Sequence, residues 1–268
     1  MIFNYFQSEK ASHIIDNFYE VYFESKDIPF ESRILPTGQS HFIYVETEKP
    51  YEITFSKGTF YNKGLIIFGQ SFRSYNLKID NESSNFGISF HPTTLYKLLK
   101  EDLSKYTDKH LCLKKVNLKI YETINPIFEK KIKNINKVKL LETALLNLPI
   151  YEDKYTKIID KTIKFIREHN GLITVENILN TINISQKNLE IQFKKIVGLT
   201  PGKYIKLYRF FSLMKKYESH EVQLKELIDM YNYYDRSHFI KDFKLFMNQS
   251  PKEYFKKNNS LLKKYLKE

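Results

Sequence analysis

The stretch "DRSHFIKDFKLFMNQSPKEYF", residues 235–255, predicts the fold of the C-terminal part of this 268-residue chain. Fifty residues earlier, "SQKNLEIQFKKIVGLTPGKYI", residues 185–205, follows the same plan. Each copy starts with a helix-capping residue, continues with apolar residues four positions apart, and ends with a hydroxyl residue, Pro and Tyr. Such self-similarity indicates one structural unit that is used twice.

The paired positions of the two copies share their chemistry. Caps match caps, core residues match core residues, and lysines match lysines. The spacing predicts helices at about 185–197 and 235–247, and a long helix from Thr200 that joins the two copies. The pairs are Ser185 with Asp235, Leu189 with Phe239, Phe193 with Phe243, Lys194 with Lys244, Thr200 with Ser250, Pro201 with Pro251, Tyr204 with Tyr254, and Lys206 with Lys256.

Each capped helix follows a shorter helical segment, "TVENILNTIN" at 174–183 and "VQLKELIDMY" at 222–231. Asn183 and Asn232 fall in the turns, where Asn tolerates positive φ better than most residues. A short helix, a tight turn and a second capped helix form a helix-turn-helix, whose second helix enters the DNA major groove. A helical bundle with solvated outer faces is the alternative, and the repeat favours the first interpretation.

Burial of the apolar stripe turns the opposite side of each capped helix outward. On that side, Arg236 suits guanine and Glu190 suits the amino group of cytosine, while isoleucine meets the methyl group of thymine. The residues predicted to face bases are Lys187, Glu190, Ile191, Arg236, Ser237, His238, Ile240 and Lys241.

A second set of residues suits the phosphates of the DNA backbone, which position a protein without reading sequence. Lysines supply the charge, and the free N–H groups that follow a helix cap bind anions. The residues predicted to contact phosphates are Lys194, Thr200, Lys206, Lys244, Ser250 and Lys256.

The charge of the chain is uneven. The net charge is +12, and residues 151–268 hold 23 Lys and Arg against 14 Asp and Glu. Residues 1–150 hold 20 against 17, so most of the excess lies in the C-terminal part. A basic domain indicates a polyanionic partner, nucleic acid first and an anionic membrane second. A lysine-rich surface that is only solvated is the alternative explanation.

The composition also argues against several classes of protein. The chain has 42% hydrophobic residues with 20 Tyr and 21 Phe, which is too apolar for disorder. Cys112 is the single cysteine, so neither an internal disulfide nor a cysteine-based zinc site is expected. The sequence shows no run of 18 apolar residues and no secretory signal, which predicts a cytoplasmic protein without a membrane span.

Residues 1 to about 90 have the pattern of a β-rich domain. Apolar runs such as "SHFIYVETE" (40–48) and "GLIIFGQ" (64–70) are separated by Gly- and Asn-containing spacers such as "SKGTFYNKG" (56–64). Short strands at such spacing predict a small sandwich or barrel.

Helical periodicity follows this β-rich segment. Residues 117–148 predict amphipathic helices that offer a face for a homodimer. "LPIYED", residues 148–153, is the predicted joint between domains at 1–150 and 151–268.

Residues from about 155 to 256 resemble the AraC/XylS family of bacterial transcription regulators. The resemblance rests on "NISQKNLEIQFKKIVGLTPGKYIKLYR" (183–209) and, more specifically, on the stretch at 235–255. It implies two helix-turn-helix units joined by a long helix, and recognition helices in adjacent major-groove segments. The positions that contact bases in the family correspond to the base-facing residues already named for this chain. Arg209 matches an arginine that is common in the joining helix of the family.

The chain departs from the family pattern at four positions. The family usually has Gly in both turns and in the loop before Ser250, where this chain has Asn183, Asn232 and Asn248. It often has small residues in the joining helix near Leu213, so a different packing of the two units is expected there.

The N-terminal region resembles a cupin-like domain that precedes this DNA-binding module in other regulators. The resemblance covers roughly residues 15–115 and implies a role in ligand sensing or dimerisation. It rests on "RILPTGQSHFIYV" (33–45), "GLIIFGQ" (64–70), "FGISFHPTTLYKLL" (86–99) and "YTDKHLCL" (106–113).

Candidate ligand-binding residues are few. The aromatic residues of the N-terminal half are predicted as core, and some of them line an effector pocket. Arg33 and Arg73 are the only arginines of this half and are candidates for an anionic ligand. The four histidines of this half show no H-x-H pair, so neither a metal site nor a cofactor is expected; they are His13, His41, His91 and His110.

The sequence therefore predicts an α+β protein with a β-rich cupin-like sandwich, flanking helices and an all-α domain of two helix-turn-helix units. The predicted function is sequence-specific transcription regulation, with no enzymatic activity. Double-stranded promoter DNA is the expected partner, with an unidentified small-molecule effector, a homodimer, and RNA polymerase if the protein is an activator. The alternatives are a low-specificity architectural DNA-binding protein and, less favoured, a cupin-type ligand-binding enzyme.

Overall fold

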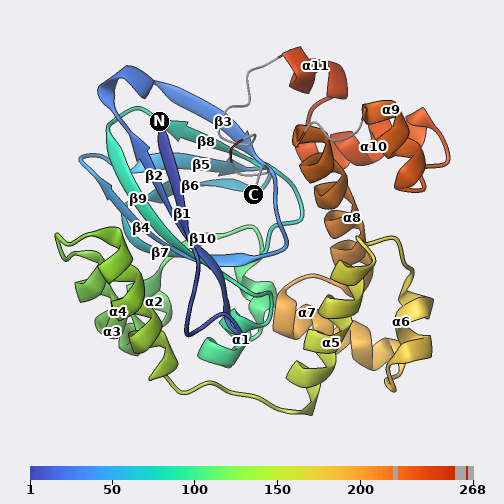
Figure 1. Ribbon diagram of the computed structural model, residues 1–268, viewed down its shortest axis with the longest axis horizontal. Coiled ribbons are helices and arrows are strands. Elements are labelled where there is room, and N and C mark those ends of the chain that lie inside the picture. Colours follow the sequence, from blue (N-terminus) through green and yellow to red (C-terminus); the bar gives the residue numbers. More distant parts are fainter. Residues whose placement is uncertain (220–222, 257–263, 265–268) are drawn as a thin grey trace.

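The β-rich half of the protein is a sandwich of two antiparallel sheets (Figure 1). The structure is a computed structural model that describes residues 1–219, 223–256 and 264. Within this part of the chain, one sheet has the order β1-β2-β9-β4-β7-β10 and the other the order β3-β8-β5-β6. The strands are β1 (Ile2–Phe6), β2 (Ile15–Phe23), β3 (Phe30–Ile34), β4 (Ser40–Thr47), β5 (Tyr51–Phe55), β6 (Gly58–Asn62), β7 (Gly64–Phe68), β8 (Tyr75–Ile79), β9 (Ser83–Phe90) and β10 (His110–Cys112).

Alternation along the strands gives the larger sheet two different faces. On β4, His41 and Val45 face the space between the sheets, whereas Phe42 and Tyr44 face the helices. The space between the sheets is filled mostly by aromatic and aliphatic side chains from both sheets. The larger sheet is thus covered on both faces, which explains the apolar runs in its sequence.

Short helices cover the outer face of the larger sheet. Phe128 stacks on Tyr44 with ring centroids 5.6 Å apart and meets Phe86 edge-on, so α3 is fixed to β4 and β9. The helical segments of this half are η1 (Ser25–Asp27), α1 (Thr94–Leu99), η2 (Leu103–Tyr106), α2 (Leu113–Val116), α3 (Leu118–Phe128) and α4 (Asn134–Leu146).

One predicted spacer is itself a strand. The segment "SKGTFYNKG" contains β6, which pairs antiparallel with β5 as a hairpin. Phe60 contacts the sandwich core on one side, while Tyr61 is exposed on the other. The hairpin forms because this alternation gives the segment one apolar face, which the Gly and Lys residues around it obscured in the sequence.

From residue 154 onward the described chain is helical, as the sequence predicts. The helices α6 and α7 form the first helix-turn-helix, α9 and α10 form the second, and α8 joins them (Figure 1). The helices are α5 (Lys154–Glu168), α6 (Val175–Thr181), α7 (Gln186–Val197), α8 (Pro201–Glu218), α9 (Leu224–Met230), α10 (Arg236–Met247) and α11 (Pro251–Lys256).

The predicted helix caps are confirmed. Ser185 and Asp235 each accept a hydrogen bond from the backbone N–H three residues later, at the starts of α7 and α10. Thr200 does the same for α8, and Ser250 forms a reciprocal capping box with Glu253. These bonds fix the register of both copies, because each cap satisfies one of the N–H groups that a helix leaves free.

The two turns differ, and one prediction for them is wrong. Asn232 has φ 54°, as expected, but Asn183 is not among the residues with positive φ. The first turn instead leaves α6 through Ile182 in extended conformation, so it needs no left-handed residue. The two copies do share a left-handed residue at the C-terminal ends of their recognition helices. Gly198 (φ 96°) ends α7, and Asn248 (φ 52°) ends α10 at the equivalent position.

Candidate nucleic-acid interface

The first recognition helix, α7, has one buried and one exposed side. Leu189 and Phe193 are fully buried, so the helix is seated on the core by the stripe that the sequence predicts. Lys187, Glu190 and Ile191 are exposed. Ile191 is 52% exposed and is the apolar member of this outward set.

The second recognition helix, α10, is seated in the same way by Phe239 and Phe243. Arg236, Ser237 and Lys241 are exposed on its outer side. Two further candidates for base contacts, His238 and Ile240, are half-buried, and the His238 ring lies edge-on against Tyr233 at 5.2 Å. The start of α10 therefore carries the more accessible polar side chains.

The candidate phosphate contacts lie on the same helices and on their neighbours. Lys194 and Lys244 are exposed in the last turns of α7 and α10, and Lys206 and Lys256 are exposed on α8 and α11. The hydroxyls of Thr200 and Ser250 are occupied as caps, at 3.4 Å from Lys203 N and 3.2 Å from Glu253 N. A phosphate would thus meet backbone N–H groups at these two positions.

A buried ion pair fixes the second unit to the joining helix. Arg209 of α8 donates to Asp242 of α10 at 3.1 Å, and both side chains are largely buried. The guanidinium group also lies 4.8 Å from the ring centre of Tyr233. Burial raises the pKa of Tyr233, and the nearby Asp242 carboxylate raises it further. The tyrosine therefore stays neutral beside the ion pair.

Equivalent tyrosines of the two copies have different partners. Tyr204, near the start of α8, donates from its hydroxyl to the carbonyl of Gly38 at 3.3 Å, in the loop between β3 and β4. Tyr254, in α11, donates to Glu218 at the end of α8 at 2.8 Å. One tyrosine thus binds the β-sandwich, and the other closes the second helix-turn-helix on the joining helix.

The β-sandwich contacts both helix-turn-helix units. Thr107 donates to the carbonyl of Gly198 at the end of α7, at 2.8 Å. Ser74 N donates to the carbonyl of Phe246 near the end of α10, at 2.7 Å, and Phe72 packs edge-on against the Phe246 ring at 5.2 Å. Both recognition helices are therefore held at their C-terminal ends by loops of the N-terminal half.

Sequence reasoning missed these contact residues. They lie in loops without a periodic pattern, and they meet partners more than 90 residues away. A local signal was present at Gly38 in "PTGQS", because Gly favours the positive φ of 78° found there. A side chain at this position would not fit, since its Cβ would lie 2.9 Å from the Tyr204 ring.

The remaining candidates belong to the N-terminal half. Arg33 is half-buried, and burial lowers the pKa of its guanidinium group, whereas Arg73 is exposed. Cys112 is half-buried. Across residues 1–219, 223–256 and 264, no group of three or more His, Cys, Asp and Glu is placed to hold a metal ion. No helix in these ranges is both long and apolar enough to span a bilayer.

Two family models match the chain. Residues 178–257 match a helix-turn-helix domain (HTH_18), and residues 8–112 match a domain of unknown function (DUF6597). The sequence matches no curated protein at a significant level.

Solved structures that this chain matches include ToxT from Vibrio cholerae. An apo ToxT variant has 12% identity and a TM-score of 0.49, covering 89% of this chain and 96% of that chain. Wild-type ToxT bound to an unsaturated fatty acid has 12% identity and a TM-score of 0.45, covering 90% and 93%. The AraC-like transcriptional activator CuxR has 15% identity and a TM-score of 0.26, covering 75% and 74%.

Proposed function

Since residues 178–257 of this chain form an AraC-type helix-turn-helix domain, we propose that the protein is a transcription regulator that reads promoter DNA with both units. The main support for this proposal is that α7 and α10 expose equivalent sides of the helix to solvent. Each is seated by two buried apolar residues and presents polar side chains on its opposite side. A helix of this kind fits the major groove, where base edges carry a distinct pattern of donors and acceptors.

The joining helix has a length that suits two adjacent contacts. Helix α8 has 18 residues and spans about 27 Å, with α7 near one end and α10 near the other (Figure 1). This length is of the same order as one turn of B-DNA, about 34 Å. The two recognition helices would therefore enter successive segments of the major groove on one side of the duplex.

We assign base contacts to the start of each recognition helix and phosphate contacts to the lysines around them. Arg236 is the strongest candidate for a base contact, because it is exposed in the first turn of α10 and its planar group binds guanine bidentately. Lys256 is exposed on α11, outside both recognition helices, and suits a phosphate.

The N-terminal half has a regulatory role in this proposal, with the division between the two parts near residue 150. Its loops hold the ends of both α7 and α10, so a change in the sandwich would alter how the two units sit relative to each other. Homodimerisation through residues 117–148, and RNA polymerase as a partner of an activator, are further parts of the proposal. A regulator of promoter DNA would act in the cytoplasm.

Selection from a random duplex library with full-length protein tests the function. The expected result is a motif that spans two adjacent turns of DNA. Anisotropy should then give an affinity about a thousandfold or more above that for a scrambled duplex at the same salt concentration. Equal binding to both duplexes would indicate an architectural protein and contradict the proposal. Salt dependence alone does not separate the two, because both kinds of protein release counterions.

Paired substitutions test the assignment of the second recognition helix. Arg236→Ala is expected to weaken binding to the selected duplex by about 1–3 kcal/mol and to relax the preference at one base step. Lys256→Ala should weaken selected and scrambled duplexes alike and lower the salt dependence. Anisotropy on duplexes changed at single positions measures both effects. If the two variants behave identically, Arg236 does not read a base.

A further inference from the structure

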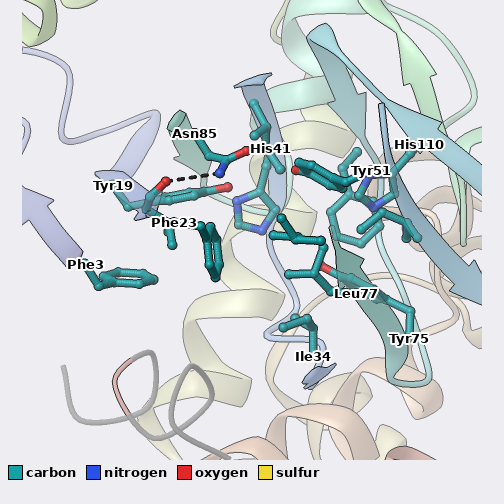
Figure 2. Close-up of a pocket in the computed structure, with 15 residues that line it drawn as sticks. Phe3, Tyr19, Phe23, Ile34, His41, Tyr51, Tyr75, Leu77, Asn85 and His110 are labelled. Atoms are coloured by element: carbon teal, nitrogen blue, oxygen red, sulfur yellow. Dashed lines mark hydrogen bonds between the residues drawn. The ribbon is translucent and has the colours of Figure 1, made fainter. Parts of the chain in front are cut away.

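A cavity of about 110 Å³ lies between the two sheets of the sandwich (Figure 2). Most of its lining is aromatic or aliphatic and comes from both sheets, with Phe23 and Phe68 on one sheet and Tyr75 and Leu77 on the other. No Lys, Arg, Asp or Glu is among the described residues that line it. A cavity of about 150 Å³ with such walls holds benzene, so this one takes at most a single small ring.

Three polar side chains line this apolar space and are more than nine-tenths buried. Within the described chain, His41 Nδ1, His110 Nε2 and Asn85 Oδ1 have no hydrogen-bond partner. Figure 2 shows the His41 ring projecting into the space that the apolar side chains surround. A buried polar atom without a partner is costly, and a molecule bound in this cavity would supply a partner that the described chain does not.

The surroundings fix the state of the two rings. Burial lowers the pKa of His41 to about 4 and that of His110 to about 3, so both are neutral at pH 7. Asn62 Nδ2 lies 2.8 Å from His110 Nδ1 and donates to it, which leaves the proton of that ring on Nε2. The cavity therefore offers a donor at His110 and holds no charge that would balance an ion.

We propose that this cavity binds a small uncharged molecule that is mostly apolar, about one ring in size, and carries a hydroxyl or carbonyl group for His110 Nε2. An anion is disfavoured because it would lose its hydration without gaining a counter-charge. A purely apolar molecule would fill the space but leave the imidazole N–H unsatisfied.

The position of the cavity links it to the DNA-binding helices, a step that rests on the proposed function. Ile34 and His41 line the cavity and flank the loop whose Gly38 carbonyl accepts from Tyr204 of α8. Phe68 and Tyr75 also line it and flank the loop that contacts Phe246 of α10. These loops could adopt more than one arrangement, each with its own relative position of the two helix-turn-helix units. A molecule that binds one arrangement more tightly would increase the population of that arrangement.

Binding of phenol, cyclohexanol, toluene and benzoate to the full-length protein without DNA tests the proposal. Calorimetry should show phenol and cyclohexanol binding at least about tenfold more tightly than benzoate. In protein with labelled histidine, the ring signals of His41 and His110 should shift on binding, while those of the exposed His13 should not. Failure of both alcohols to bind, or equal binding of benzoate, would overturn the proposal.

Two variants locate the site. His110→Phe keeps an aromatic ring but removes the N–H, so phenol should bind about tenfold more weakly while toluene binds as before. Leu77→Phe adds volume to the wall and should reduce the affinity for every probe. His13→Gln is the matched control and should change nothing. Thermal melts establish that each variant is folded.

Unchanged phenol binding in both variants would place the bound molecule elsewhere and refute the site. Because no DNA is present, this failure is distinct from failure of the proposed function. If the protein selects a DNA motif but binds no neutral probe, only the proposal for the cavity is refuted. If it binds the neutral probes but selects no DNA motif, only the proposal of sequence-specific regulation is refuted.

Discussion

Asp242→Ala is expected to destabilise the protein by about 3–5 kcal/mol, since it leaves the Arg209 guanidinium group buried without its carboxylate. The lost bond is the 3.1 Å contact that ties α10 to α8. The remaining neighbour, the Tyr233 ring at 4.8 Å, attracts the cation but carries no negative charge to replace the carboxylate. Urea unfolding followed by circular dichroism measures the loss, and hydrogen exchange in α10 should accelerate most.

Two controls separate the ion pair from the side chains that form it. The double variant Arg209→Met with Asp242→Leu should recover most of the stability, because apolar residues of similar size often replace a buried pair without loss. Lys164→Ala should cost less than about 0.5 kcal/mol, because the Lys164–Glu168 pair is exposed on the surface of α5 at 3.7 Å. A loss of under 1 kcal/mol for Asp242→Ala would mean that Arg209 finds water or another acceptor.

Acid is expected to destabilise the sandwich through its two buried histidines. Both pKa values lie below the ordinary value of 6.5, so the unfolded chain takes up protons more readily than the native state. The contribution of each ring to stability is complete above about pH 6.5 and is lost as the pH falls toward about 4 for His41 and about 3 for His110. Between pH 7 and 4.5 the loss is about 2–3 kcal/mol for each histidine.

The neighbours of the two rings explain the direction. The His41 ring stacks on Phe68 and meets Tyr19 edge-on, and the His110 ring lies 4.2 Å from the centre of Phe68, so neither cation would be hydrated. The charge of Asp16 raises the pKa of His41 slightly, while the charge of His41 lowers that of His110 further. Tyr51 is neutral throughout this range, and burial raises its pKa further still.

Urea unfolding of the wild type at several pH values, beside a His41→Phe, His110→Phe double variant, measures this effect. The unfolding free energy of the wild type should fall relative to that of the double variant as the pH falls below 6.5. The carboxylates are common to both proteins and cancel. His13→Gln should follow the wild type. Parallel pH profiles of the wild type and the double variant would show that the histidines are accessible to water in the native state.

The sequence by itself determined the helical half of the protein. The caps Ser185, Thr200, Asp235 and Ser250 satisfy backbone N–H groups within three residues, so their signal is local and survives in any tertiary context. The buried stripe of each recognition helix is likewise set by a period of 3.6 residues. The exposed sides of α7 and α10 followed from those stripes.

The local sequence pattern predicted less well those conformations that depend on tertiary contacts. Asn183 and Asn232 look equivalent in sequence, yet only the second has positive φ, because the first turn leaves its helix through an extended residue. The β6 hairpin was hidden because a strand is recognised by its pairing and burial more than by its composition.

Only the tertiary structure decided the contacts between the two halves and the content of the sandwich. His41 and His110 are 69 residues apart in the chain, and nothing in their neighbours predicts that both rings line one cavity. Gly38 and Tyr204 meet across 166 residues. Helix caps and periods are properties of a few neighbouring residues, whereas a cavity or an interdomain bond depends on how whole elements pack, and that packing is settled only when the chain is folded.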